Sequence, residues 1–213
     1  AKDGAEPAGN SRLRLAIQRA RDANMPIDTI ERAIKRGAGA GEGAEYHEIA
    51  YEGYGPHGVA ILVEAMTDNR NRAAAEIRST FNRGGGNLGE SGSVRWLFDS
   101  RGVVTAEVGT SDPDEIALLA IDAGADDVQI EDSAIDVYTE PGQLEAVRQK
   151  LEESGVQVVD SQLAMVAKTN VALEGQAAEQ TIRLIERLEE LDDVQQVYSN
   201  LDIPAELAAS LAG

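Results

Sequence analysis

The sequence contains no cysteine and only two histidines among its 213 residues. The absence of cysteine excludes disulfide bridges, a thiol nucleophile and any metal site built from thiolates, and it fits a reducing compartment. The histidines, His47 and His57, stand in loop-like sequence without a local partner that would orient them as bases. Surface histidines near turns are the simpler interpretation. We therefore expect no enzyme active site, no metal and no cofactor.

Basic residues are also scarce, with 19 lysines and arginines against 38 aspartates and glutamates. A net charge of −19 argues against nucleic-acid binding unless the charges are separated along the chain. They are separated: residues 104–165 hold 2 basic and 15 acidic residues, whereas 14 of the 19 basic residues precede position 104. A molecule polarised in this way can present a cationic surface to phosphates while its acidic part faces away.

Two familiar types of site are also missing. Gly84–Gly89 spells the G-x-G-x-x-G pattern of dinucleotide-binding loops, but a helix pattern precedes it and a strand pattern follows it, the reverse of what that motif requires. A structural turn is the better interpretation. The acids between Asp122 and Asp132 lack the residue order of a calcium-binding loop and are better interpreted as a solvated face. No apolar run approaches membrane-spanning length, and we expect a cytoplasmic protein without a membrane partner.

Hydrophobic spacing predicts helices alternating with strands, as in α+β proteins. Two short helices, with apolar stripes at Leu13–Ala20 and Ile27–Ile34, precede a Gly-rich linker at 37–43, where we place the first domain boundary. After position 103, strands again alternate with helices of similar length. A final strand is expected at Val194–Tyr198.

The central segment is predicted as a β-α-β unit whose first strand covers Val59–Glu64. Its helix buries apolar residues that recur every four positions, namely Ala73, Ile77 and Phe81. Its second strand covers Ser93–Phe98 and contains the only tryptophan, Trp96. Tyr51, Tyr54 and Trp96 could form a surface that stacks on bases, although for Trp96 we favour a place in the core.

Arginines are the remaining functional signal. On the first helix they lie in pairs seven residues apart, but charge alone leaves a solvated surface as the simpler interpretation. The turn Asn69–Arg72 is less ordinary, because Asn and Arg together supply donors for phosphates and base edges. The candidate nucleic-acid-binding residues are Arg12, Arg14, Arg19, Arg21, Lys35, Arg36, Asn69, Arg70, Asn71, Arg72, Arg78 and Arg83.

Several motifs, spread over essentially the whole chain, resemble the YebC/PmpR family. They are LRLAI at Leu13–Ile17, ANMP at Ala23–Pro26, IERAI at Ile30–Ile34, YEGYGP at Tyr51–Pro56, TDNRNRA at Thr67–Ala73, NLG at Asn87–Gly89 and VQQVYSN at Val194–Asn200.

The resemblance implies three domains, and a basic helix is expected before Ala1. An N-terminal helical domain would cover 1–45, a middle α/β domain 46–103 plus 168–213, and an acidic α/β domain, inserted into the middle one, 104–167. The final strand would then return to the sheet that contains Val59–Glu64.

The resemblance also implies a function. Members of the family are described as DNA-binding transcriptional regulators, and we expect this chain to bind double-stranded DNA through a basic surface of its N-terminal and middle domains. Relatives, including the mitochondrial translational activator of cytochrome oxidase, act in translation. The alternative expectation is therefore a translation factor that binds ribosomal RNA or the ribosome.

Overall fold

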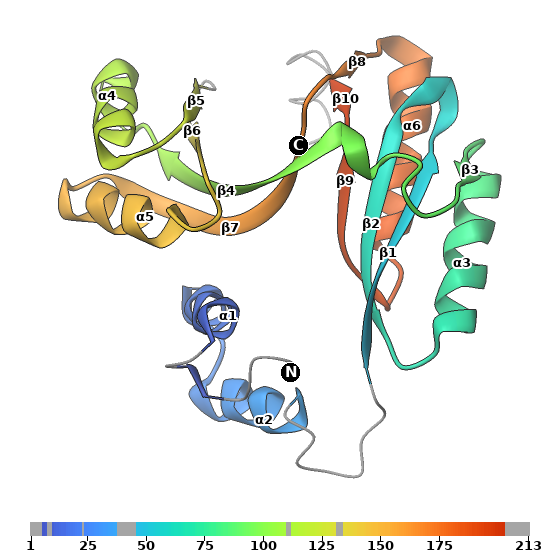
Figure 1. Ribbon diagram of the computed structural model, residues 1–213, viewed down its shortest axis with the longest axis horizontal. Helices are drawn as coiled ribbons and strands as arrows, with labels where there is room; N and C mark the ends of the chain where they lie inside the picture. The colour runs from blue at the N-terminus through green and yellow to red at the C-terminus, as the bar shows by residue number, and fades with distance from the viewer. Residues whose placement is uncertain are drawn as a thin grey trace. The chain divides into compact units, whose positions relative to one another are not determined.

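The computed structural model describes most of the chain, namely residues 6–7, 10–22, 24–37, 46–109, 112–130 and 134–202. These residues form an α+β fold, as the hydrophobic spacing predicts (Figure 1). The chain divides into two compact units, of which the first joins Ala1–Ala44 to Ser100–Ala164 and the second joins Glu45–Asp99 to Met165–Gly213. The finer division into three domains stays a prediction.

The second unit is built on an antiparallel sheet. Its described strands lie in the order β3 (Asn87–Leu88), β1 (His47–Tyr54), β2 (Ala60–Thr67) and β9 (Val194–Ser199). Pairing of β9 with β2, for example Val63 with Val197, confirms that the chain returns to the central sheet near its C-terminal end. Two short parallel strands, β8 (Val171–Ala172) and β10 (Leu201–Asp202), pair beside it.

The strand β2 is buried on both faces, because its side chains alternate between two cores. On one face Ile61, Val63 and Ala65 pack with α3 (Arg70–Arg83) and α6 (Gly175–Glu189). On the other face Ala60 and Leu62 pack with three buried residues from outside the sheet, namely Val94, Phe98 and Met165. In Figure 1, α6 lies behind the strands, and the segment that leads into β4 crosses in front of them.

The helix α3 ends at the glycine turn, but it begins at Arg70, inside the segment that the sequence predicts as a turn. Asn69 caps the first turn, since its Oδ1 accepts a hydrogen bond from the backbone N–H of Arg72 at 3.1 Å. The glycine turn follows the last residue. A Cβ on Gly84 would lie 2.7 Å from Leu184 Cδ1, and one on Gly86 would lie 2.6 Å from the carbonyl oxygen of Tyr54. The glycines thus let α3, α6 and β1 approach closely, which is the structural role that we expect for this turn.

The first unit contains α1 (Ser11–Asp22), α2 (Ile27–Gly37) and a second sheet. The described strands of this sheet lie in the order β5 (Asp127–Ile130), β6 (Ala134–Thr139), β4 (Phe98–Glu107) and β7 (Gln157–Ala167). Its core joins Val104 and Val137 of the sheet to Ile116 of α4 (Pro113–Ala123) and Val147 of α5 (Leu144–Glu153).

Three predictions about the central segment are wrong. A 3₁₀ turn at Arg95–Leu97 replaces most of the strand expected at Ser93–Phe98, and β4 begins only at Phe98. Val94 and Phe98 are buried, but Trp96 between them is 64% exposed and does not lie in the core. His47 opens the strand β1 rather than a loop. The sequence does not predict this strand because it contains Gly53, and glycine is uncommon in strands. Glycine is needed at this position, since a Cβ would lie 2.7 Å from the carbonyl oxygen of Asn87.

Candidate nucleic-acid interface

The N-terminal helices carry six of the candidate residues. Arg14 donates from Nη1 to the carbonyl oxygen of Pro7 at 2.8 Å, and Nε of Arg19 lies 3.2 Å from Oδ1 of Asp160. Arg21 and Lys35 are exposed to solvent. The side chains of the remaining two, Arg12 and Arg36, lie outside the described residues.

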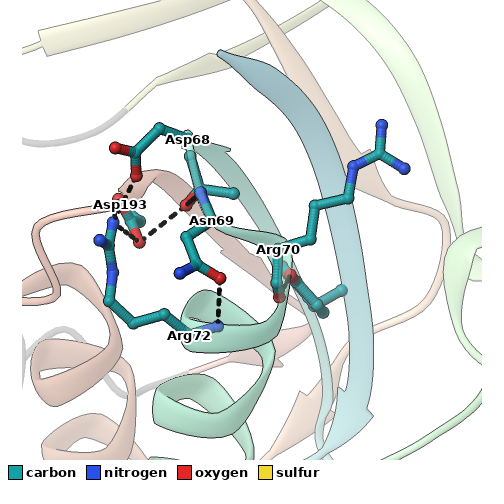
Figure 2. A network of polar contacts seen from close by, with 7 residues as sticks. Asp68, Asn69, Arg70, Arg72 and Asp193 are labelled. Carbon is teal, nitrogen blue, oxygen red and sulfur yellow. Dashed lines mark hydrogen bonds and ion pairs between the residues drawn. The ribbon is translucent and has the colours of Figure 1, made fainter. Parts of the chain in front are cut away.

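Two residues of the Asn69–Arg72 turn hold the start of α3 in place (Figure 2). The backbone N–H of Asn69 donates to Thr67 Oγ1 at 3.0 Å, while its side chain caps the helix. Nη2 of Arg72 lies 2.9 Å from Asp68 Oδ1 and 2.9 Å from Asp193 Oδ2. The side-chain oxygen of Asn69 and Nη2 of Arg72 are therefore engaged within the protein.

Arg70, between these two residues, has a different environment. Figure 2 shows its side chain pointing away from the network of Asp68, Arg72 and Asp193. Its guanidinium forms no ion pair with any residue that the structure describes, and only its backbone oxygen is used, accepting from Tyr51 Oη at 3.4 Å. Burial and the charge of Asp193 raise the pKa of Tyr51, against the effect of Arg70, so the phenol remains a donor.

An exposed stripe runs along α3. It consists of residues at positions i, i+4, i+7 and i+11, namely Asn71, Ala75, Arg78 and Asn82. All four are exposed, and the stripe contains no carboxylate. Within the described ranges, Arg78 has no acidic partner. The stripe therefore offers one guanidinium and two amides to a ligand outside the protein.

Arg83 lies at the other end of α3, beside a depression of about 490 Å³ that residues of α3 and α6 line. Two further arginines, Arg183 and Arg187, line the depression from α6. Arg183 contacts Glu179 at 3.4 Å. Sequence reasoning missed these two arginines because acidic residues surround them on α6, and only the packing of α6 against α3 brings them near Arg83.

A second group of residues lies on the opposite face of the sheet, and sequence reasoning missed its buried acid, Glu52. Glu52 of β1 is only 4% exposed, and its carboxylate accepts backbone hydrogen bonds from Gly92, Val94 and Arg95 at 2.7, 2.8 and 2.8 Å. Burial acts to raise the pKa of Glu52, but these three amides and the charge of Arg95 outweigh burial and lower the pKa. The charged carboxylate thus fixes the loop that leads to Trp96.

Two aromatic side chains extend from this loop and from β1. Nε1 of Trp96 and Oη of Tyr54 each donate to the carbonyl oxygen of Ser93 at 3.1 Å. The alternation of apolar and polar residues along the sequence could not predict this arrangement, because the arrangement depends on contacts between residues that lie about 40 positions apart.

Neither a metal centre nor a membrane helix is found in the part of the chain that the structure describes. No cluster of three or more acidic or histidine side chains there could hold a metal ion. No helix in those ranges is long and apolar enough to cross a membrane.

Known proteins resemble this chain over nearly its whole length. Family models match the TACO1/YebC second and third domain at residues 46–201 and the TACO1/YebC protein N-terminal domain at residues 1–40. Two relatives, from Roseiflexus castenholzii and Moorella thermoacetica, are each named probable transcriptional regulatory protein and are each 54% identical to this chain. The matches cover 95% and 98% of this chain and 81% and 84% of the relatives.

A solved structure agrees with these sequence matches. The crystal structure of a conserved hypothetical protein from Aquifex aeolicus superposes with a TM-score of 0.89 at 44% identity. The match covers 96% of this chain and 85% of the other. Because family models and closely similar relatives agree across both units, the chain belongs to the TACO1/YebC family.

Proposed function

We propose that this protein is a transcriptional regulator that binds double-stranded DNA and has no catalytic activity of its own. Relatives that are 54% identical over nearly the whole chain carry the name probable transcriptional regulatory protein, which supports a regulatory role. We propose the cytoplasm as the place where it acts.

The observation that carries the proposal is the uncompensated charge on α3. Arg70 and Arg78 are exposed, neither has an acidic partner among the described residues, and the amides of Asn71 and Asn82 lie on the same helix. Guanidinium and amide groups contact phosphates and base edges in protein–DNA complexes. Uncompensated cations at fixed positions suit such contacts better than cations already neutralised by acids do.

The other candidate nucleic-acid-binding residues differ in the contacts that they make within the protein. Arg72 and Asn69 build the turn that positions Arg70, so we assign them a supporting role. Arg83 on α3, with Arg21 and Lys35 on the N-terminal helices, would add phosphate contacts. Arg12, Arg14, Arg19 and Arg36 remain proposed contacts of the same kind.

RNA is the second candidate ligand, bound on its own or as part of the ribosome. The observation that favours it is the exposure of Trp96, because an exposed indole suits unpaired bases, which structured RNA displays in its loops. The bases of a DNA duplex are stacked on one another and offer no free face to it.

Fluorescence anisotropy with a labelled DNA duplex tests the main proposal. The double variant Arg70→Gln/Arg78→Gln should bind roughly tenfold more weakly than the unchanged protein. The control Arg101→Gln/Arg148→Gln also removes two cations, but both are paired with acids in the first unit, and its affinity should not fall. Equal losses in the two variants would mean that net charge, and not this surface, determines binding.

Co-sedimentation with ribosomes tests the second candidate. If the protein binds ribosomes much more tightly than the duplex, and the α3 variant weakens only the ribosome complex, the exposed surface of α3 binds RNA. Duplex competing efficiently with ribosomes for the protein would instead favour DNA.

A further inference from the structure

We propose that Trp96, Tyr54 and Arg95 form a platform on which an unpaired nucleobase stacks, so that the protein binds a single-stranded segment of nucleic acid. This inference rests on the proposed function, since it requires that the chain bind nucleic acid. It adds the kind of strand that is recognised and a surface separate from α3.

The two aromatic rings are held at one point. Trp96 and Tyr54 both donate to the carbonyl oxygen of Ser93, each at 3.1 Å, so their polar ends converge on a single atom. Their side chains remain 64% and 37% exposed. Ring faces that are both fixed and exposed are the feature that proteins use to stack on bases of single strands.

The loop beneath the rings is rigidly built. The buried carboxylate of Glu52 holds the backbone N–H groups of Gly92, Val94 and Arg95. Val94 is completely buried in the core. It lies between Ser93, whose carbonyl oxygen holds both aromatic side chains, and the 3₁₀ turn. An exposed tryptophan on such a loop loses little further freedom when a ligand stacks on it, which favours binding.

The charge and the size of the surface both fit a nucleotide. Arg95 is exposed beside Trp96 and forms no ion pair in the described ranges, although its charge acts on the buried carboxylate of Glu52, so its guanidinium can contact a phosphate. From residue 86 to residue 99, all of which are described, Trp96 is the only large apolar side chain that is exposed. A stable protein–protein interface needs about 800 Å² from each partner, whereas a base needs one ring face.

The platform and α3 lie on opposite faces of the sheet. In the pairing of β1 with β2, Glu52 is opposite Leu62 and Tyr54 is opposite Ala60, so these residues share a face. Ala60 and Leu62 pack away from α3, whose core residues contact Ile61 and Val63 instead. Variants at the platform therefore leave the α3 stripe unchanged.

The chain provides its own probe, because Trp96 is its only tryptophan. Intrinsic emission would be recorded while the full chain is titrated with short oligo(dT), with short oligo(rU) and with a blunt DNA duplex. Binding of each labelled ligand would be measured separately by anisotropy. Stacking should quench the emission with single strands and leave it nearly unchanged with the duplex. The dT and rU arms distinguish single-stranded DNA from RNA as the source of the base.

Variants then test each group of the platform. Trp96→Leu should weaken single-strand binding by about tenfold, and Trp96→Phe should restore part of the loss because it keeps a ring face. Arg95→Gln should lower the slope of log affinity against log salt concentration by about 0.7, as expected for one phosphate contact on a single strand. Tyr46→Leu is the matched control, since Tyr46 is 62% exposed in the same unit but outside the platform. It should leave binding unchanged.

The outcomes separate this inference from the proposed function. Two results with single strands would overturn the inference alone: binding that does not quench the emission of Trp96, and unchanged binding to Trp96→Leu. Tight binding of the duplex without any binding of single strands would have the same consequence. Failure of every nucleic acid to bind would overturn both. Emission that responds to RNA-free ribosomal proteins but to no oligonucleotide would also overturn the inference, because the platform would then dock a protein.

Discussion

Arg72 and Asp193 join the start of α3 to the turn that precedes β9, with Nη2 of Arg72 3.0 Å from Oδ1 and 2.9 Å from Oδ2 of Asp193. Asp193 also accepts from Thr67 Oγ1 at 3.0 Å, and its carbonyl oxygen accepts from the backbone N–H of Met66 at 2.8 Å. One residue therefore ties β2, α3 and β9 together. It also fixes the turn from which Arg70 extends into solvent.

Replacing Asp193 by Ala should lower the free energy of unfolding by about 1–3 kcal/mol, because the buried hydroxyl of Thr67 loses its acceptor. Asp68→Ala is the control, since Asp68 contacts the same guanidinium at the same distance of 2.9 Å but is exposed. It should cost less than about 1 kcal/mol. Urea denaturation measures both variants, and equal costs would show that Asp193 is no more important than a surface acid.

Glu52 should make stability depend on pH at the acidic end. Its pKa in the folded protein lies below the ordinary value of 4.5, so the folded state favours the charged carboxylate. The stabilisation is therefore complete above the pKa of the unfolded chain and is lost as the pH falls through the folded pKa. Glu52→Gln should lower the free energy of unfolding by about 1–3 kcal/mol at pH 7.

Denaturation of the unchanged protein and of Glu52→Gln, repeated from pH 7 down to pH 3, measures this effect. The difference between the two proteins should shrink below about pH 4.5. A difference that stays constant across this range would mean that the carboxylate acts by shape alone and not by its charge.

The glycine turn predicts a steric effect at Gly86. Gly86→Ala would place a Cβ 2.6 Å from the carbonyl oxygen of Tyr54, a backbone atom of β1 that cannot move alone. The expected loss in free energy of unfolding is about 1–3 kcal/mol. Gly142→Ala is the control, because nothing lies within 4 Å of the added Cβ. Equal melting temperatures for the two variants would contradict the close approach of β1 and the turn.

Periodic patterns in the sequence predicted much of the fold. The apolar residues Ala73, Ile77 and Phe81, four positions apart, and the glycine turn after them predicted α3, and these residues lie within one or two helical turns of one another. The strand β2 is recognisable because β-branched and aliphatic residues fill both faces. Both patterns involve residues that are close together in the chain, so a single sequence is enough to reveal them.

The candidate site could be predicted only in part, because its roles depend on distant contacts. Arg70 and Arg72 are equivalent in sequence, yet only Arg72 meets Asp193, which lies 121 positions away. In a strand Trp96 would share a buried face with Val94 and Phe98, but a 3₁₀ turn directs it outward. That turn depends on Glu52, some 40 positions earlier, and no local pattern marks Glu52 as buried.

The salt dependence of duplex binding tests the central proposal, phosphate contacts from α3, most directly. Affinity would be measured over a range of salt concentrations for the unchanged protein, Arg70→Gln, Arg78→Gln and the control Arg101→Gln. Each α3 variant should lower the slope of log affinity against log salt concentration by about 1, because one phosphate contact fewer releases fewer counterions. The control should keep the full slope, since Arg101 is already paired with Asp126 at 2.8 Å. Identical slopes for all four proteins would show that α3 does not contact the phosphates.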